Sequence, residues 1–234
     1  MIGVYDYTVI LTYLSALSAG IGIIVSLNGT GHPYYGTFFL LACGLCDAFD
    51  GRVARKKKGR SDLEKKFGIQ IDSLSDLVAF GVLPGCIGNA MIRVSPKLPE
   101  IPRIKTQTRV EFQIAVLLFA IILIYILAAL IRLAYFNVTE EERQKSEAGC
   151  RKYYEGLPVT SASLIFPTVM LFQYIIPMDI TPIYFIVMFL MSIAFIAKIQ
   201  IPKPQFKGIM IMIGIGVLEF LVLLFYLFRA KHLL

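Results

Sequence analysis

The chain alternates between long apolar stretches and short polar segments. Forty consecutive residues, 7–46, contain no Asp, Glu, Lys or Arg. A helix that crosses a bilayer needs about 20 apolar residues, so this stretch alone has room for two such helices. The same pattern along the rest of the chain predicts seven membrane-spanning helices, at residues 7–27, 34–56, 68–92, 111–136, 157–176, 182–197 and 208–228.

Glycine and proline mark the turns between several of these helices. Residues 29–33 contain two glycines and a proline, which predicts a tight turn between the first two spans. Residues 177–182 begin and end with proline and are predicted to form a hairpin turn between the fifth and sixth spans. If that segment were only a kink, the spans would number six. We therefore expect one all-α integral-membrane domain over residues 1–234, a polytopic bundle of six or seven spans.

Composition agrees with a membrane protein. Hydrophobic residues make up 57% of the chain and charged residues only 17%, whereas charged residues form about a quarter of ordinary soluble domains. The formal net charge is +7. The basic residues lie in short segments between apolar spans, which is typical of membrane topology and of binding to anionic headgroups. No nucleic-acid partner is expected.

The distribution of basic residues predicts the orientation. Residues 52–66 hold eight basic and two acidic residues. With seven spans, this segment, residues 139–152 and residues 198–207 all fall on one side, which is predicted to be the cytoplasm together with the N-terminus. Residues 93–109 then lie on the other side despite five basic residues against one acidic residue, so this loop conflicts with the positive-inside rule.

Four aspartates within the spans are the strongest candidates for function, because ionisable groups in membrane helices are costly. Asp47 and Asp50 are three residues apart near the end of the second span. Asp72 and Asp76 are four residues apart near the start of the third. Each spacing places both members on one helix face. Since the two helices are antiparallel neighbours, we expect the two pairs to face each other at similar depth.

Four carboxylates in a low-dielectric site cannot all ionise without help from cations. Oxygen ligands alone favour a hard divalent ion such as Mg²⁺, Mn²⁺ or Ca²⁺. Two such ions would balance four negative charges, and paired metals commonly stabilise phosphoryl displacement. Spacing alone leaves two alternatives open: a proton or cation pathway, and aspartates that form ion pairs with Arg52 and Arg55.

The neighbouring residues favour a phosphate ligand. Gly51 directly follows Asp50 and leaves room for close backbone approach. Arg55 lies five residues after Asp50, where its fork of donors could hold a phosphate, and the small Ala54 keeps the same face open.

These residues resemble the signature of the CDP-alcohol phosphatidyltransferases, D-x-x-D-G-x-x-A-R followed by G-x-x-x-D-x-x-x-D. All eight signature residues are present, from Asp47 to Asp76. The spacer of 12 residues between Arg55 and Gly68 is longer than is usual for the family, by about one helical turn. Residues 67–84, 132–137 and 153–158 are moreover similar to the serine-transferring branch of the family.

The resemblance implies a homodimer of helical protomers in the cell membrane, with a multi-pass topology and an active site facing the cytoplasm. It implies transfer of the phosphatidyl group of CDP-diacylglycerol to the hydroxyl of L-serine, which yields phosphatidylserine and CMP. Two divalent ions, Mg²⁺ or Mn²⁺, would be held by Asp47, Asp50, Asp72 and Asp76. Asp76 would also act as the catalytic base, and the CDP part of the substrate would be contacted by Gly51, Ala54 and Arg55.

The acceptor pocket is expected near the fourth span and the turn that follows it. Arg132 is a candidate partner for the serine carboxylate, with snorkelling to the interface as the alternative. Asn137 and Tyr154 complete this predicted pocket. Glu219, alone in the last span, is expected to form a helix–helix hydrogen bond.

Two other functions stay open from the sequence. The first is the same chemistry with glycerol phosphate or inositol phosphate as acceptor, which would require extra basic residues such as those of residues 52–66. The second is a cation-coupled transporter that uses the four aspartates, although an ion pathway has no need for residues 51–55.

Overall fold

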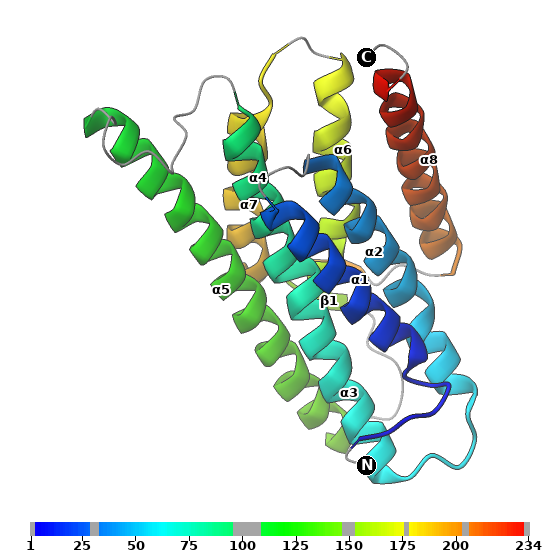
Figure 1. The fold of residues 1–234 in the computed structure, drawn as a ribbon. Helices are drawn as coiled ribbons and strands as arrows, with labels where there is room; N and C mark the ends of the chain where they lie inside the picture. Colours follow the sequence, from blue (N-terminus) through cyan, green and yellow to red (C-terminus); the bar gives the residue numbers. More distant parts are fainter. Residues whose placement is uncertain are drawn as a thin grey trace.

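The computed structural model describes residues 3–28, 33–95, 109–146, 153–175, 178–202 and 206–231. This part of the chain is almost entirely helical (Figure 1). Its α-helices are α1 (Ile10–Leu27), α2 (Pro33–Lys56), α3 (Asp62–Asp76), α4 (Leu83–Val94), α5 (Arg109–Ser146), α6 (Ala162–Ile175), α7 (Thr181–Ile196) and α8 (Phe206–Lys231). The all-α prediction is therefore confirmed.

The helices form one bundle. α1 packs against α2 and α4, the long α5 packs against α7, and α8 packs against α6 and α2. In Figure 1, the first described residues, the connection from α2 to α3 and the last turns of α5 lie together at the lower end. We call this the site end. The last turn of α8 lies at the opposite end.

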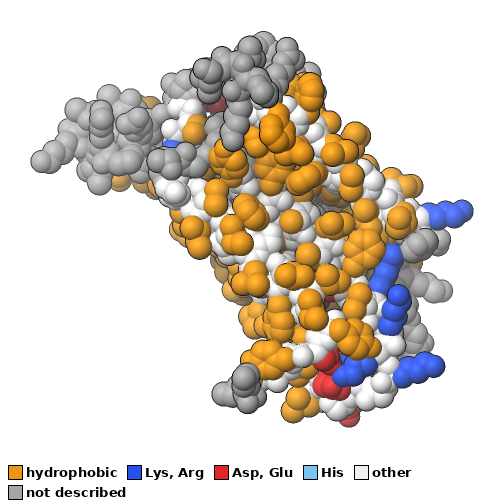
Figure 2. Space-filling view, turned by 45° about the vertical axis from the view of Figure 1, so that its right-hand side comes forward, with side chains coloured by type: hydrophobic (Ala, Val, Ile, Leu, Met, Phe, Trp, Pro, Cys, Tyr) orange, Lys and Arg blue, Asp and Glu red, His pale blue; other side chains and the backbone are white. Residues whose placement is uncertain are grey.

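Several helices are long and apolar enough to cross a membrane. Four stretches meet this requirement by length and composition: Ile10–Leu27, Asp62–Val94, Phe112–Arg143 and Lys207–Phe228. Only 11% of the most apolar part of the last stretch is buried inside the protein, and hydrophobic side chains cover much of the face in Figure 2. So large an apolar surface indicates contact with lipid rather than water. Two shorter apolar helices, Val159–Gln173 and Thr181–Ile196, are separate from each other; the total of six or seven spans stays a prediction.

The predicted third span is one continuous helical stretch with a π-helical segment inside it, Leu77–Val82. The N–H of Leu83 donates to the carbonyl of Val78, five residues back. Pro84 has no N–H, so it cannot donate to the carbonyl of Phe80 in the usual helical pattern. Tyr125 of α5 donates its hydroxyl to that carbonyl instead, at 2.7 Å. This π-helical segment begins directly after Asp76.

The fully buried core lies where α4, α5, α6 and α7 meet. Tyr125 packs edge-on against Phe166 with ring centroids 5.6 Å apart, and Phe166 lies 4.7 Å from Tyr184. Tyr184 donates its hydroxyl to the carbonyl of Pro84 at 2.8 Å. Both tyrosines therefore satisfy backbone carbonyls of the helix that carries two of the four candidate aspartates.

The predicted end of the fourth span, Phe136, is wrong for the helix. α5 continues for ten more residues to Ser146. Residues 139–152 were expected to form a polar connector, but good helix formers fill this stretch, and Arg143 forms an ion pair with Glu140 at 2.6 Å. A polar sequence ends the apolar span without ending the helix.

A two-stranded antiparallel sheet joins the segments before α6 and after α7. Tyr153–Glu155 (β1) pairs with Gln200–Pro202 (β2). Gly156 follows with a φ of 76°, and its N–H donates to the carbonyl of Ile199 at 2.8 Å. A short 3₁₀ turn, Val159–Ser161, precedes α6. The fifth helix therefore begins at Ala162 and not at the predicted residue 157, because the turn at Gly156 and the 3₁₀ turn come between β1 and α6.

Candidate metal and substrate site

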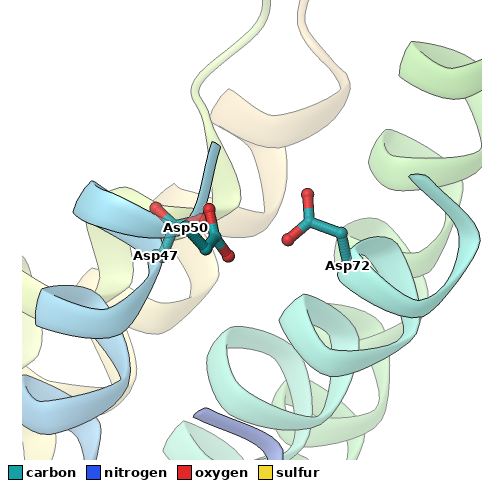
Figure 3. Close-up of side chains that lie close together, drawn as sticks. All are labelled: Asp47, Asp50 and Asp72. Carbon is teal, nitrogen blue, oxygen red and sulfur yellow. The ribbon is translucent and has the colours of Figure 1, made fainter. Parts of the chain in front are cut away.

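Three of the four predicted aspartates come together near the site end. Asp47 and Asp50 lie on α2 and Asp72 on α3, and one carboxylate oxygen from each lies within 4.8 Å of the others. Figure 3 shows the two α2 carboxylates facing that of Asp72 across the space between the helices. Asp50 is buried, with 7% of its surface exposed. The expectation that the two helices present carboxylates to each other is met for these three residues.

Asp76 is not a member of this group of three. It is the last residue of α3, one turn beyond Asp72, which places it about 6 Å further along the helix axis. It also adjoins the π-helical segment that begins at Leu77. The predicted cluster of four is therefore three carboxylates with a fourth one turn away.

The charge of the three-aspartate cluster has no basic partner within the part of the chain that the structure describes. The ion pairs found there join other residues, and none of them includes Asp47, Asp50 or Asp72. Three adjacent carboxylates without a countercharge suit a divalent cation, because oxygen donors are the ligands that Mg²⁺ and Mn²⁺ prefer. The donor set thus fits the metal that the sequence predicts.

Helix α1 supports the cluster through residues that sequence reasoning missed. Thr12 donates its hydroxyl to one carboxylate oxygen of Asp50 at 3.5 Å, and the N–H of Gly51 donates to the other. Ser75 of α3 donates its hydroxyl to the carbonyl of Thr12 at 3.2 Å. All three helices therefore meet at Thr12. A hydroxyl in an apolar span is the only signal in the sequence, and it does not indicate a partner.

The predicted nucleotide-binding residues continue from the cluster along α2. A Cβ atom at Gly51 would lie 3.2 Å from a guanidinium nitrogen of Arg55, so glycine leaves room for this side chain. Arg55 is exposed and makes no hydrogen bond or ion pair with another described residue. Ala54 and Arg55 line a cavity of about 390 Å³ together with residues of the α2–α3 connection.

Arg132 and Tyr154, from the predicted acceptor pocket, lie in one layer of α5 and β1. Arg132 is buried, with 6% of its surface exposed, and its Nε donates to the carbonyl of Leu157 at 3.3 Å. Its guanidinium carbon lies 5.2 Å from the ring centroid of Phe136, which in turn lies 6.0 Å from the ring of Tyr154. Such burial does not fit the alternative of a side chain that snorkels to the interface.

Asn137 connects this layer to the aspartate helix. Its side-chain amide donates to the hydroxyl of Ser73 at 2.8 Å, and Ser73 is next to Asp72 in the sequence. The predicted acceptor residues on α5 thus approach α3 at the level of the carboxylate cluster.

The N-terminal segment is tied to the α2–α3 connection at the same end. Lys57 forms ion pairs with Asp6 at 2.5 Å and with Glu64 at 2.8 Å. The hydrogen bond from Lys57, followed by that from Thr8, lowers the pKa of Asp6 to about 2. This pair therefore stays ionised at neutral pH and holds the segment before α1 against the connection.

Glu219 has the role predicted for it. The hydroxyl of Thr168 on α6 donates to its carboxylate on α8, so a helix–helix hydrogen bond is confirmed.

Fold and site together define a helical membrane protein with an acidic cluster suited to divalent ions. The sequence model of the CDP-alcohol phosphatidyltransferase family matches residues 8–227. The chain therefore belongs to the CDP-alcohol phosphatidyltransferase family, as the signature residues indicated.

Named relatives are similar to this chain over part of their length. The CDP-diacylglycerol–serine O-phosphatidyltransferase of Saccharomyces cerevisiae is 38% identical over 162 residues, which cover 66% of this chain and 50% of the yeast protein. The archaetidylserine synthase of Methanothermobacter thermautotrophicus is 27% identical over 199 residues, 85% of this chain and 70% of that protein. The CDP-diacylglycerol–serine O-phosphatidyltransferase of Helicobacter pylori is 29% identical over 133 residues, 54% of this chain and 44% of that protein. The chain thus matches about half the length of the yeast and Helicobacter proteins.

Proposed function

We propose that this chain transfers the phosphatidyl group of CDP-diacylglycerol to the hydroxyl of L-serine, giving phosphatidylserine and CMP. The observation that carries the proposal is the cluster of Asp47, Asp50 and Asp72, formed by the family signature where two membrane helices meet. The relatives named for transfer to serine support the choice of acceptor.

The three clustered aspartates would hold a divalent ion, Mg²⁺ or Mn²⁺. A second ion would bind beside the first, with Asp76 as an additional ligand. When bound, such ions neutralise the diphosphate of the substrate and the charge that develops on departing CMP. Thr12 and Gly51 keep the carboxylate of Asp50 oriented toward the cluster.

Arg55 binds the diphosphate of CDP-diacylglycerol in this proposal. It lies just beyond the cluster along α2, and a guanidinium can contact two phosphate oxygens at once. Gly51 has no side chain and Ala54 only a methyl group, so both leave room for the approach of the nucleotide. The diacyl tails remain in lipid, since the exposed faces of the bundle are apolar.

Asp76 acts as the base for the serine hydroxyl. The serine oxygen forms a bond to the phosphorus of the phosphatidyl group, the bond from that phosphorus to the CMP oxygen breaks, and Asp76 accepts the hydroxyl proton. The position of Asp76 outside the group of three supports this role, because its carboxylate is less committed to the cation. A positioned base typically contributes 10²–10⁴-fold to the rate.

Serine binds between α5, β1 and α3 in this account. Arg132 provides a positive charge for the serine carboxylate, and Asn137 and Tyr154 border the same space. The support is geometric: the contact between Asn137 and Ser73 brings this layer to the level of Asp72.

The protein would be a multi-pass homodimer of the cell membrane with its site end in the cytoplasm. The basic cluster of residues 52–66 lies at the site end, which agrees with the positive-inside rule. This orientation lets water-soluble serine reach the cluster while CDP-diacylglycerol arrives from the bilayer.

One observation favours a second candidate, transfer to glycerol phosphate or inositol phosphate. Arg55, Lys57, Arg60 and Lys65 line the cavity at the site end, and an acceptor with its own phosphate would need such cations.

An acceptor panel decides between the two candidates. Purified protein in detergent receives CDP-diacylglycerol with Mg²⁺ or Mn²⁺, and CMP release is followed with L-serine, glycerol 3-phosphate, inositol phosphate and inositol. Of these four acceptors, we expect only L-serine to support fast CMP release. Faster release with a phosphorylated alcohol would overturn the assignment of serine as acceptor.

A further inference from the structure

Four of the six residues that line the cavity at the site end are basic. Its lining residues are Ala54, Arg55, Lys57, Gly59, Arg60 and Lys65. The volume of about 390 Å³ is within the usual range for small-molecule pockets, 300–1,000 Å³. No acidic side chain lines it. The cavity therefore suits an anion.

Two arginines of this cavity each lie over a signature glycine. A Cβ atom at Gly51 would lie 3.2 Å from Arg55, and one at Gly68 would lie 2.8 Å from Nη2 of Arg60. Gly51 directly follows Asp50, and Gly68 precedes Asp72 by one helical turn. One guanidinium group therefore lies beside α2 and the other beside α3, and both belong to the lining of the cavity.

The remaining cations of the cavity already have partners. Lys57 pairs with Asp6 and Glu64, and Lys65 pairs with Asp62 at 3.3 Å. Arg60 differs, because its Nη2 donates to the carbonyl of Glu64 at 3.1 Å while its buried Nε has no hydrogen-bond partner among the described residues. Arg55 likewise makes no hydrogen bond or ion pair with a described residue.

The local backbone holds Arg60 in this position. Gly59 has a φ of 73°, a conformation that favours glycine and turns the chain back toward α3. Ser61 then begins the helix with a capping box, in which its hydroxyl accepts from the N–H of Glu64 at 3.2 Å and its own N–H donates to the Glu64 carboxylate at 2.7 Å. Arg60 is thus fixed between a turn and a capped helix.

We propose that Arg60 and Arg55 form a phosphate-binding pair, so that this cavity holds the nucleotide phosphate of CDP-diacylglycerol and, after the reaction, of CMP. The inference rests on the proposed function and adds to it a residue outside the signature. Arg60 belongs to the 12-residue spacer between Arg55 and Gly68, which supplies the second guanidinium.

Binding of CMP by the purified protein in detergent with Mg²⁺ tests the pair by titration calorimetry. We expect Arg60→Gln to weaken CMP binding by about 10- to 100-fold, the usual loss for a hydrogen bond to a charged group. Arg60→Lys keeps the positive charge but loses the forked guanidinium, so its affinity for CMP should lie between those of the unmodified protein and Arg60→Gln. Lys58→Gln is the matched control, since this exposed residue of the same connection loses the same charge but does not line the cavity. It should bind CMP as the unmodified protein does.

Three results would overturn the proposal in properly folded variants, as judged by gel filtration and melting temperature. Equal losses for Lys58→Gln and Arg60→Gln would show only general electrostatic attraction. The site would be assigned to a lipid headgroup if Arg60→Gln left CMP binding unchanged but lost affinity, relative to the unmodified protein, for phosphatidylglycerol vesicles and not for phosphatidylcholine vesicles. An Arg60→Gln effect confined to the KM for the alcohol would assign it to the acceptor.

The binding test does not depend on turnover. If no alcohol supported CMP release but Arg60→Gln still weakened CMP binding, the proposed reaction would be wrong while the phosphate site would stand. Cytidine, which has no phosphate, should bind equally to the unmodified protein and to Arg60→Gln.

Discussion

Individual aspartates in the cluster have different surroundings, although the sequence presents them as two similar pairs. Asp50 receives hydrogen bonds from Thr12 and Gly51, whereas Asp76 stands outside the group of three. Helical spacing sufficed to predict that Asp47, Asp50 and Asp72 face one another. The support from Thr12 could not be predicted, because it depends on how α1 crosses the other two helices.

Asparagine substitutions distinguish the proposed base, Asp76, from the proposed metal ligands. Asp76→Asn keeps the size of the side chain but removes the basic carboxylate, so CMP release should fall by about 10²–10⁴-fold while Mn²⁺ still binds. Asp47→Asn should lose Mn²⁺ affinity first and recover in part at high Mn²⁺ concentration. The measurements are steady-state CMP release and Mn²⁺ binding by electron paramagnetic resonance. Identical responses of the two variants to added metal would show that Asp76 has no separate role.

Thr12 is expected to position Asp50 for metal binding. Thr12→Val removes the hydroxyl at nearly constant volume and should raise the Mn²⁺ concentration for half-saturation by about tenfold, as losses of such supporting hydrogen bonds usually do. Thr12→Ser should restore the affinity. Ser18→Ala is the matched control, since its hydroxyl also bonds α1 to α2, at the Phe39 carbonyl, away from the cluster. The role is refuted if Thr12→Val and Ser18→Ala shift Mn²⁺ binding equally.

At the scale of elements, the apolar spans were predictable and the polar ends of helices were not. The hydrophobic pattern located the spans, because lipid-facing helices are apolar over their full width. The same pattern predicted that the fourth helix ends at Phe136, although α5 continues to Ser146. Polar helix formers carry no hydrophobic signal, so the pattern could not show that the helix continues. The β1–β2 pair escaped prediction because three-residue strands have too little periodicity to recognise.

Gly156 tests the importance of the strand-to-helix junction. Its φ of 76° disfavours other residues, and a Cβ atom there would lie 2.6 Å from the carbonyl oxygen of Phe195. Gly156→Ala should therefore lower the melting temperature in detergent, with a cost of at least about 1–2 kcal/mol from the backbone conformation alone. Gly214→Ala is the control, since nothing lies within 4 Å of a Cβ atom there. A melting temperature of Gly156→Ala equal to that of the control would contradict this reading.

At the scale of the whole molecule, the bundle joins two environments at one place. Apolar side chains cover the outer faces of α1, α5 and α8, while Lys and Arg side chains gather at the lower right of Figure 2. The aspartate cluster lies between these regions, where the lipid nucleotide and the water-soluble alcohol of the proposed reaction would meet. Composition alone predicted the membrane class, and the eight signature residues predicted the family. The relative placement of α5, β1 and α3 around the acceptor side required the structure.

In the proposed function, the aspartate cluster binds a divalent cation on which phosphatidyl transfer depends. The most direct measurement follows CMP release from CDP-diacylglycerol and L-serine as free Mn²⁺ is raised from zero in a chelator buffer, for the unmodified protein and Asp72→Asn. We expect no CMP release in excess chelator, full recovery with Mn²⁺ for the unmodified protein, and a much higher Mn²⁺ requirement for Asp72→Asn. Undiminished CMP release in excess chelator would contradict it.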